Sequence, residues 1–276
     1  MTIKRHTLMQ TLMLIGTLAY LAGCDGGAGT SSSAQATDSS QASSSSRSAD
    51  SISVDAAPVA MRRLSKLEYN NTVRDLLGTA LEPANDFPFD DFNQFDDAAS
   101  FPSVSLPHLM WYNVSAARLA EEAIESALAG NRDVVNCDLE AVSCPQIVIS
   151  EFGLRAWRRP ITEAESERLM VFYDEALALS NNRAAAMQAL LHRFILSPNF
   201  IFRPEFDEDI NSSEAKELGS YELASRLSYF LWGSMPDEEL FAKAADDSLK
   251  DSQVLRSQVA RMIDSQQNTG QARPKK

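Results

Sequence analysis

Residues 221–245, YELASRLSYFLWGSMPDEELFAKAA, form the most regularly patterned stretch of the chain. Apolar residues recur in it at helical spacing, which predicts an amphipathic helix with one buried face. The residues of this stripe are Leu223, Ala224, Leu227, Phe230 and Leu231. Glu222 and Arg226 lie four residues apart, in the order that favours a pair on the exposed side of a helix. The stretch is therefore typical of well-formed helices and does not by itself indicate an active site.

The residues after the stripe predict where this helix ends and the next one begins. Gly233 can adopt the left-handed conformation that often ends a helix. Ser234 and Asp237 have the spacing of a helix cap, and Pro236 is tolerated in a first turn. We therefore expect two consecutive helices here.

The same helical period continues over most of the chain from Met61 onward. Further helices are expected at residues 63–78, 108–130, 145–159, 161–179 and 183–197, the last of them ending before Pro198. No alternating strand pattern of comparable strength accompanies them. The chain is therefore predicted to be all-α, with one or more orthogonally packed multi-helix bundles behind a disordered N-terminal tether.

Two of these helices carry clear start signals. Ser65 with Glu68, and Thr162 with Glu165, match the capping box, in which each side chain binds the other residue's backbone N–H. Gly78 stands at the expected C-terminal cap of the first helix. The apolar residues expected on the buried face of that helix are Leu64, Leu67, Val73, Leu76 and Leu77.

The N-terminal 23 residues have the build of an export signal. A basic start at Lys4 and Arg5 precedes an apolar run from Leu8. The stretch LAGC, which ends at Cys24, resembles the lipobox of bacterial lipoproteins, in which the signal is removed and the new N-terminal cysteine is lipidated. An ordinary membrane anchor, or a cysteine that follows a signal by chance, is the alternative. We predict a signal peptide at residues 1–23, lipidation of Cys24 and a place in the cell envelope, facing the periplasm or the cell surface.

Residues 24–58 are rich in Ser, Ala, Gly and Thr. Such a segment cannot bury enough apolar surface to offset its ordering entropy, so we expect a disordered linker. At about 5–6 Å × √n its root-mean-square reach is roughly 30 Å, which would hold the folded part away from the membrane. Asp25 resembles the inner-membrane retention signal of some bacteria, but other bacteria do not follow that rule, so inner and outer membrane both stay open.

The charge balance limits the partners that the chain can have. It contains 25 Lys and Arg against 38 Asp and Glu, a net charge of −13. Such acidity argues against nucleic acid as a partner and against electrostatic attraction to anionic lipid head groups. Attachment to a membrane is therefore expected through the N-terminal lipid.

Taken in order, four motifs of the chain resemble a known group of proteins. The motifs are RRLSKLEYNNTVRDLLG (62–78), RAWRRPITEAE (155–165), ILSPNFIFRPE (195–205) and YELASRLSYFLWGSMPDEEL (221–240). They resemble tandem domains of unknown function in large exported bacterial proteins, which are abundant in planctomycetes and often joined to c-type cytochrome domains. The resemblance covers nearly all of residues 61–264 and implies no particular reaction or catalytic residue.

The chain departs from that group in two respects. Relatives continue into further domains after the helix expected at residues 252–264, whereas here residues 265–276 form a polar tail, so we expect a C-terminally truncated chain. Some relatives carry the haem-attachment pattern C-x-x-C-H, which this chain lacks. No cofactor is therefore expected here, and any haem c is expected on a partner or on domains outside this chain.

These boundaries predict the domain organisation. It comprises a signal peptide (1–23), a lipid-anchored linker (24–58), an N-terminal helical domain (59–135), a disulfide loop with a central helical domain (136–206), an incomplete further helical domain (207–264) and the polar tail (265–276).

Cys137 and Cys144 lie seven residues apart between two expected helices. In an oxidising periplasm such a pair favours a disulfide, and the resemblance supports this, because related proteins often have two cysteines just before the RRP segment. Free thiols and a metal site are the alternatives, although zinc or haem would need further ligands. Beyond the signal, the histidines are His108 and His192, on different expected helices. His192 is expected in the core or hydrogen-bonded at its edge rather than on haem.

Two charged clusters offer weaker hypotheses. In the loop DFPFDDFNQFDDAASF (86–101), calcium could bind the carboxylates of Asp90, Asp91, Asp96 and Asp97, but the spacing is not that of an EF-hand, and the interleaved phenylalanines favour an acidic loop packed onto the helices. An anion could bind Arg155, Arg158 and Arg159 beside the helix that begins at residue 163. We favour the alternative that these arginines pair with Glu163, Glu165 and Glu167.

Two classes of function are consistent with these features. The first is a non-catalytic, lipid-anchored helical module that serves binding or assembly beside a cytochrome-linked or polysaccharide-handling system. The second is part of an envelope enzyme, an oxidoreductase or a hydrolase, whose catalytic domains lie outside this chain. We favour the first, because no nucleophile motif, phosphate loop or pair of catalytic histidines is evident in the sequence.

Overall fold

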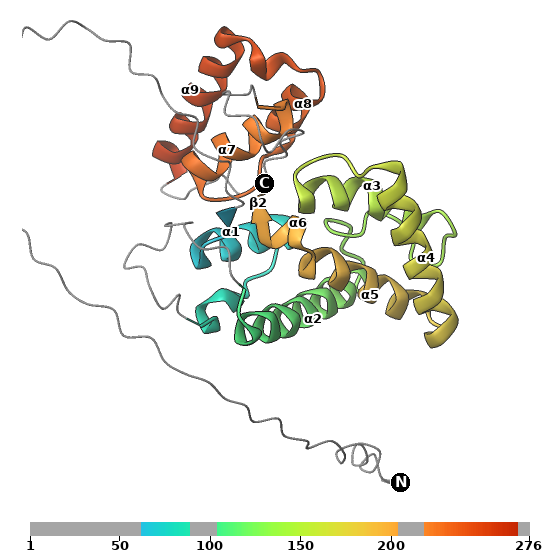
Figure 1. The fold of residues 1–276 in the computed structure, drawn as a ribbon. Coiled ribbons are helices and arrows are strands. Elements are labelled where there is room, and N and C mark those ends of the chain that lie inside the picture. Colours follow the sequence, from blue (N-terminus) through green and yellow to red (C-terminus); the bar gives the residue numbers. More distant parts are fainter. Residues whose placement is uncertain (1–61, 89–103, 204–217, 270–276) are drawn as a thin grey trace, which may run out of the picture. The chain divides into compact units, whose positions relative to one another are not determined.

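The computed structural model describes residues 62–88, 104–203 and 218–269 (Figure 1). In these residues the regular structure is helical apart from one short pair of strands. The helices are α1 (Lys66–Leu77), α2 (Leu106–Leu128), α3 (Cys144–Trp157), α4 (Glu163–Ser180), α5 (Arg183–Leu196), α6 (Pro198–Ile201), α7 (Ser220–Trp232), α8 (Glu238–Ala245) and α9 (Ser252–Thr269), with 3-10 turns at Pro83–Asp86 and Ser248–Lys250. The prediction of an all-α fold is confirmed. The expected signal peptide, Cys24 and the Ser-rich linker lie outside the described residues.

Both predicted capping boxes are present. The Glu68 backbone N–H donates to the Ser65 hydroxyl at 3.2 Å, and the Ser65 N–H donates to the Glu68 carboxylate at 2.8 Å. Thr162 and Glu165 exchange the corresponding bonds at the start of α4. Gly78 ends α1 in the left-handed conformation, with φ of 69°. These helix boundaries depend on residues three positions apart, which is why the sequence predicts them well.

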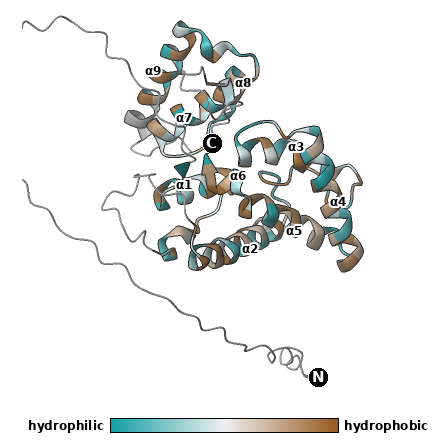
Figure 2. Ribbon diagram, in the orientation of Figure 1, coloured by the Kyte–Doolittle hydropathy of each residue, from teal (hydrophilic) through white to brown (hydrophobic). Residues whose placement is uncertain are grey.

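The larger of two hydrophobic cores is built around α5. This helix packs along α2 and α4 and also contacts α3 and α6 (Figure 1). Its buried residues are Ala186, Met187, Leu190, Leu191, Phe194 and Ile195. Figure 2 shows apolar residues along both α2 and α5. Next to α2 lies a cluster of aromatic rings, formed by Tyr69, Phe87, Tyr112 and Phe200.

A smaller core lies among α7, α8 and α9. Its buried residues are Ala224, Trp232, Leu240, Ala244, Leu249 and Met262. The indole N–H of Trp232 donates to the Met262 carbonyl at 3.1 Å, which satisfies the one polar atom of this side chain. Tyr229, on the same helix as Trp232, belongs to the larger core. Helix α7 therefore takes part in both cores.

The predicted apolar stripe of α7 is partly wrong. Phe230 is 85% exposed, and the buried residues of the helix are Ser220, Ala224, Ser228, Tyr229 and Trp232. The stripe assumes one buried face, whereas α7 buries side chains toward two cores. The buried hydroxyl of Ser228 donates to the Ser234 carbonyl at 2.7 Å, which satisfies this polar group inside the protein.

The structure also corrects the predicted burial of Leu67 and the predicted cap of α8, because contacts with distant segments decide both. Leu67 is 64% exposed, while Asn71 and Thr72 of α1 are buried, because polar contacts cover the side of α1 that meets α7. The cap of α8 is Asp237, whose carboxylate accepts from the Leu240 N–H at 2.9 Å. The Ser234 hydroxyl instead donates to the Asp75 carboxylate of α1.

The first described residues form a short antiparallel pair of strands with the segment that follows α6. Strand β1 (Arg62–Arg63) pairs with β2 (Phe202–Arg203), with Arg62 opposite Arg203. The Leu64 N–H then donates to the Ile201 carbonyl at 2.9 Å. The segment before α1 is therefore bonded to the segment after α6. Among the described residues, every helix is too short or too polar to span a bilayer.

Candidate functional site

A buried arginine lies where α3 ends. Arg158 has a left-handed backbone, with φ of 58°, and is 3% exposed. Its guanidinium donates to the carbonyls of Asn199, Phe200 and Phe202, and to the Tyr229 hydroxyl at 3.3 Å. Carbonyls at the end of a helical turn carry partial negative charge, so they compensate this buried cation without a carboxylate. We call Arg158, Tyr229 and the groups bonded to them the Arg158 hub.

Tyr229 of α7 forms the other half of the hub. Its hydroxyl is hydrogen-bonded to the Thr72 hydroxyl at 2.9 Å. The guanidinium of Arg203 lies over its ring, 4.7 Å from the centroid, and pairs with Glu68 at 3.3 Å. Burial lowers the pKa of Arg203, and the neighbouring Glu68 opposes that shift. A single side chain of α7 thus contacts groups from α1, β2 and the end of α3.

A second group of polar contacts joins α1 to the end of α7. The Asn71 amide donates to the Gly233 carbonyl at 3.2 Å. The Ser234 hydroxyl donates to the Asp75 carboxylate at 2.6 Å, which explains why Ser234 does not cap α8. Arg155 of α3 donates to the Asp75 backbone carbonyl at 3.0 Å. Helices α1, α3 and α7 are therefore held together by directed bonds as well as by apolar packing.

The three arginines of the predicted anion site have separate partners in the chain. Of the predicted ion pairs, the one between Arg159 and Glu165 is present, with two guanidinium–carboxylate bonds of 2.8 and 2.9 Å. Arg155 and Arg158 instead bind backbone carbonyls. Anion binding by this set stays a prediction, and the described contacts give each arginine a role in the fold.

A cleft of about 570 Å³ lies between α4 and α5. Its apolar lining consists of Trp157, Leu169, Phe172, Leu196 and Pro198. Its polar lining consists of Glu165, Arg168, His192, Arg193, Ser197 and Asn199. The volume falls within the range of about 300–1,000 Å³ that small-molecule sites occupy. An apolar wall with a few polar groups is also typical of such sites.

Of the charged groups that line the cleft, Glu165 is paired with another described side chain, whereas the two arginines are not. Hydrogen bonds from Arg159 lower the pKa of Glu165 to about 2. At neutral pH this carboxylate is therefore ionised, and both of its oxygens accept from Arg159. The guanidinium of Arg193 stacks over Phe172, 4.5 Å from the ring centroid. Neither Arg168 nor Arg193 has a hydrogen bond or ion pair with another described residue. Two cationic groups therefore line the cleft with no anionic partner in the described chain.

The Arg158 hub positions one end of this cleft. Arg158 donates to the Asn199 carbonyl at 2.6 Å, and Asn199 is part of the lining. Trp157, the residue before Arg158, also lines the cleft, and its indole N–H donates to the Phe194 carbonyl at 3.3 Å. The same residues that join α3 to α6 therefore fix the cleft wall.

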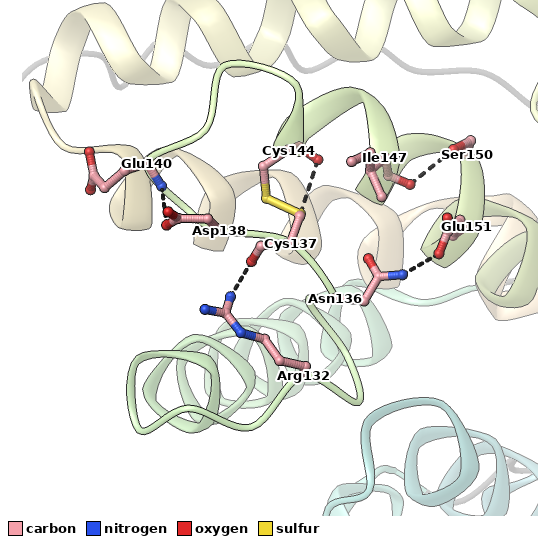
Figure 3. The surroundings of a disulfide bond; sticks show 9 residues. All are labelled: Arg132, Asn136, Cys137, Asp138, Glu140, Cys144, Ile147, Ser150 and Glu151. Carbon is pink, nitrogen blue, oxygen red and sulfur yellow. Dashed lines mark hydrogen bonds between the residues drawn. A yellow bond between two sulfur atoms is a disulfide. The ribbon is translucent and has the colours of Figure 1, made fainter.

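The predicted disulfide between Cys137 and Cys144 is confirmed, with Cα atoms 5.4 Å apart (Figure 3). Cys144 is the first residue of α3, and Cys137 lies in the loop that follows α2. The Arg132 side chain donates to the Cys137 carbonyl, and the Asn136 amide donates to Glu151 of α3 (Figure 3). The loop is thus tied to α3 by the disulfide and by a side-chain hydrogen bond.

The remaining predicted residues have structural partners or lie outside the described part. His192 of α5 donates through Nε2 to the Asn113 side-chain oxygen at 3.0 Å, at the edge of the core. His108 of α2 is buried, with Nδ1 2.7 Å from the Ser105 hydroxyl. Within residues 62–88, 104–203 and 218–269, no three potential metal ligands gather. The candidate calcium ligands lie outside these ranges; they are Asp90, Asp91, Asp96 and Asp97.

The sequence singles out Arg158 only as a candidate anion ligand, and it does not indicate the cleft or the partners of Arg158 in the hub. The lining side chains come from α3, α4, α5 and α6, each of which looks like ordinary helical structure in the sequence, and no short motif contains them all. The one available signal was the Arg158–Arg159 pair directly before Pro160, because two charged residues at the end of a buried helix need partners.

Comparison with family models divides the described chain into three consecutive matches. Residues 62–125 match PSD3, a protein of unknown function (DUF1587). Residues 144–205 match PSD5, a protein of unknown function (DUF1595), and residues 218–273 match PSD4, a protein of unknown function (DUF1592). No curated protein and no solved structure shows a significant match to the chain.

Proposed function

We propose that this chain is a non-catalytic binding module of the cell envelope. It carries three tandem domains of unknown function, of the PSD3, PSD5 and PSD4 types. Its attachment would be a lipid on Cys24, in agreement with the export signal and the LAGC stretch that precede the described residues. Its ligand or partner would belong to a cytochrome-linked or polysaccharide-handling system, in agreement with the resemblance of the four sequence motifs.

The observation that carries this proposal is the cleft between α4 and α5. It combines an apolar wall with guanidinium, imidazole and amide groups that can hold a ligand in one orientation. Hydrogen bonds hold the residues behind the cleft in place, because Arg158 and Trp157 donate to the backbone of α6 and α5. A preformed cleft reduces the entropy that a protein loses on binding.

The state of Glu165 favours binding over acid–base chemistry in this cleft. A general acid or base works best with a pKa near the operating pH. The pKa of Glu165 is lowered to about 2, and Arg159 donates to both of its oxygens. Glu165 therefore suits a structural role at the cleft wall.

An NMR titration of the isotopically labelled mature protein would test the proposal. The panel contains a reduced and an oxidised c-type cytochrome, a neutral oligosaccharide and an acidic oligosaccharide. We expect at least one of them to shift the Trp157 indole and Asn199 backbone signals, with signals from α9 unchanged. Shifts confined to residues outside the cleft, or none with any of these probes, would reject the cleft as the binding site.

Attachment is tested separately by labelling cells with radioactive palmitate. Wild-type protein should incorporate label and sediment with membranes, and Cys24→Ala should lose both properties. Equal labelling of the two proteins would remove lipid attachment at this residue from the proposal.

A further inference from the structure

The cleft is a cationic site on an acidic protein. The chain has a net charge of −13, yet Arg168 and Arg193 face the cleft without an anionic partner among the described residues. The one carboxylate in the lining, Glu165, is occupied by Arg159. Some arginines elsewhere in the described chain, such as Arg203 and Arg261, are paired with carboxylates. The unpaired positive charge of the cleft is therefore free to bind an anionic group.

Stacking holds one of the two guanidinium groups in place. Arg193 lies 4.5 Å from the centroid of the Phe172 ring, which fixes the plane of its hydrogen-bond donors. Arg168 and Phe172 are four residues apart on α4, so they share one face of that helix. Arg168 and the guanidinium of Arg193 therefore both border the part of the cleft formed by this face of α4, where a planar carboxylate can accept from each.

The other lining groups favour a ligand that also has hydroxyls and an apolar face. The side-chain amide of Asn199 has no partner among the described residues, although its backbone is held by Arg158 and Ser197. A free amide can both donate to and accept from a hydroxyl. Leu169, Leu196 and Pro198 supply an apolar surface beside these polar groups. A sugar ring has hydroxyls on its rim and C–H groups on its faces, which matches this arrangement.

We propose that the cleft between α4 and α5 binds a carboxylated sugar, a uronic acid residue, with its carboxylate at Arg168 and Arg193 and its hydroxyls at Asn199. This inference rests on the proposed binding function and specifies the ligand class of the same cleft. An acidic peptide offers the carboxylate but lacks the ring of hydroxyls. The free monosaccharide and a polymer containing it share the same chemistry.

Isothermal titration calorimetry on the full mature chain tests the proposal. The probes are trigalacturonate, galacturonate, neutral galactotriose and triglutamate. We expect trigalacturonate to bind, its affinity to fall on raising the salt concentration, and galactotriose and triglutamate to bind at least ten-fold more weakly. A galacturonate affinity similar to that of the trimer would indicate a free sugar acid as the ligand, and a much weaker one a polysaccharide; both support the proposal.

Substitutions inside and outside the cleft test whether trigalacturonate binds at Arg168 and Arg193. Arg168→Gln and Arg193→Gln should each weaken trigalacturonate binding about ten-fold or more, because each removes a charge-assisted hydrogen bond. Arg256→Gln, an exposed arginine of α9 outside the cleft, should bind as the wild type does. Both cleft arginines are exposed, so unchanged melting temperatures are expected and serve as the folding control.

Three results would overturn the inference. They are absence of trigalacturonate binding, equal affinity for galactotriose or triglutamate, and unchanged affinity in both cleft variants. If another probe of the NMR panel still shifts the cleft signals in these cases, the binding function survives and only the sugar-acid assignment is lost.

Discussion

Arg158 has a backbone conformation that glycine adopts more easily, with φ of 58°. A non-glycine residue in this region has a conformational cost of order 1 kcal/mol. The conformation persists because the guanidinium satisfies the buried carbonyls of Asn199, Phe200 and Phe202. Lysine could not replace it, since an ammonium group lacks the planar fork that reaches several acceptors at once.

The role of Arg158 can be separated into its backbone and side-chain parts. Arg158→Ala should lower the free energy of unfolding by about 3–5 kcal/mol, because it leaves buried carbonyls without donors. Arg158→Gly should be less destabilising than Arg158→Ala by about 1 kcal/mol, because it relieves the left-handed strain. Urea denaturation measures both, with Arg256→Ala as the exposed control. Loss of less than 1 kcal/mol in both Arg158 variants would contradict the structural role of the guanidinium.

The ion pair between Glu165 and Arg159 predicts a pH dependence. The pKa of Glu165 falls from 4.5 to about 2 when the protein folds, chiefly through the hydrogen bonds from Arg159. A lowered acid pKa stabilises the fold above about pH 4.5, and the contribution is lost as the pH falls toward 2. Because the pair is partly exposed to solvent, we expect Glu165→Gln to cost about 1–2 kcal/mol at pH 7.

Urea denaturation of wild type and Glu165→Gln between pH 3 and pH 7 measures this dependence. The difference in unfolding free energy between the two proteins should shrink below about pH 4.5. A difference that stays constant over this range would show that the carboxylate charge is not the source of the stabilisation.

At the scale of single elements, the sequence predicts helix ends better than buried faces. The boxes at Ser65 and Thr162 depend on groups three residues away, and both are present. The buried face of α7 depends on two cores made by distant segments, so a single apolar stripe mispredicts Phe230. The cleft is harder still, because α4 and α5 each have an ordinary amphipathic pattern and the site exists only where they meet.

The disulfide joins the α2–α3 loop to the first turn of α3. Replacing both Cys137 and Cys144 by serine should lower the unfolding free energy by about 2–3 kcal/mol, since the closed loop is short. In the wild-type protein, mass spectrometry of non-reduced peptides should find the two residues joined. Alkylation of both thiols without prior reduction would refute the linkage in the native protein.

At the scale of the whole molecule, three family segments contribute to one hub. Thr72 and Glu68 come from the first matched segment, Arg158 from the second and Tyr229 from the third. Helix α7 also takes part in both hydrophobic cores. The described residues all lie in one compact unit, in which the hub holds the end of the cleft. We therefore predict that the three matched segments unfold together.

Pulse-labelling hydrogen exchange in increasing urea, followed by mass spectrometry, measures whether the three matched segments unfold together. Peptides from α1, α5 and α7 represent the three matched segments. We expect all three peptides to lose protection at the same urea concentration, because the Arg158 hub and the shared cores couple their unfolding. Loss of protection in α7 at a clearly lower urea concentration, while α1 and α5 remain protected, would contradict it.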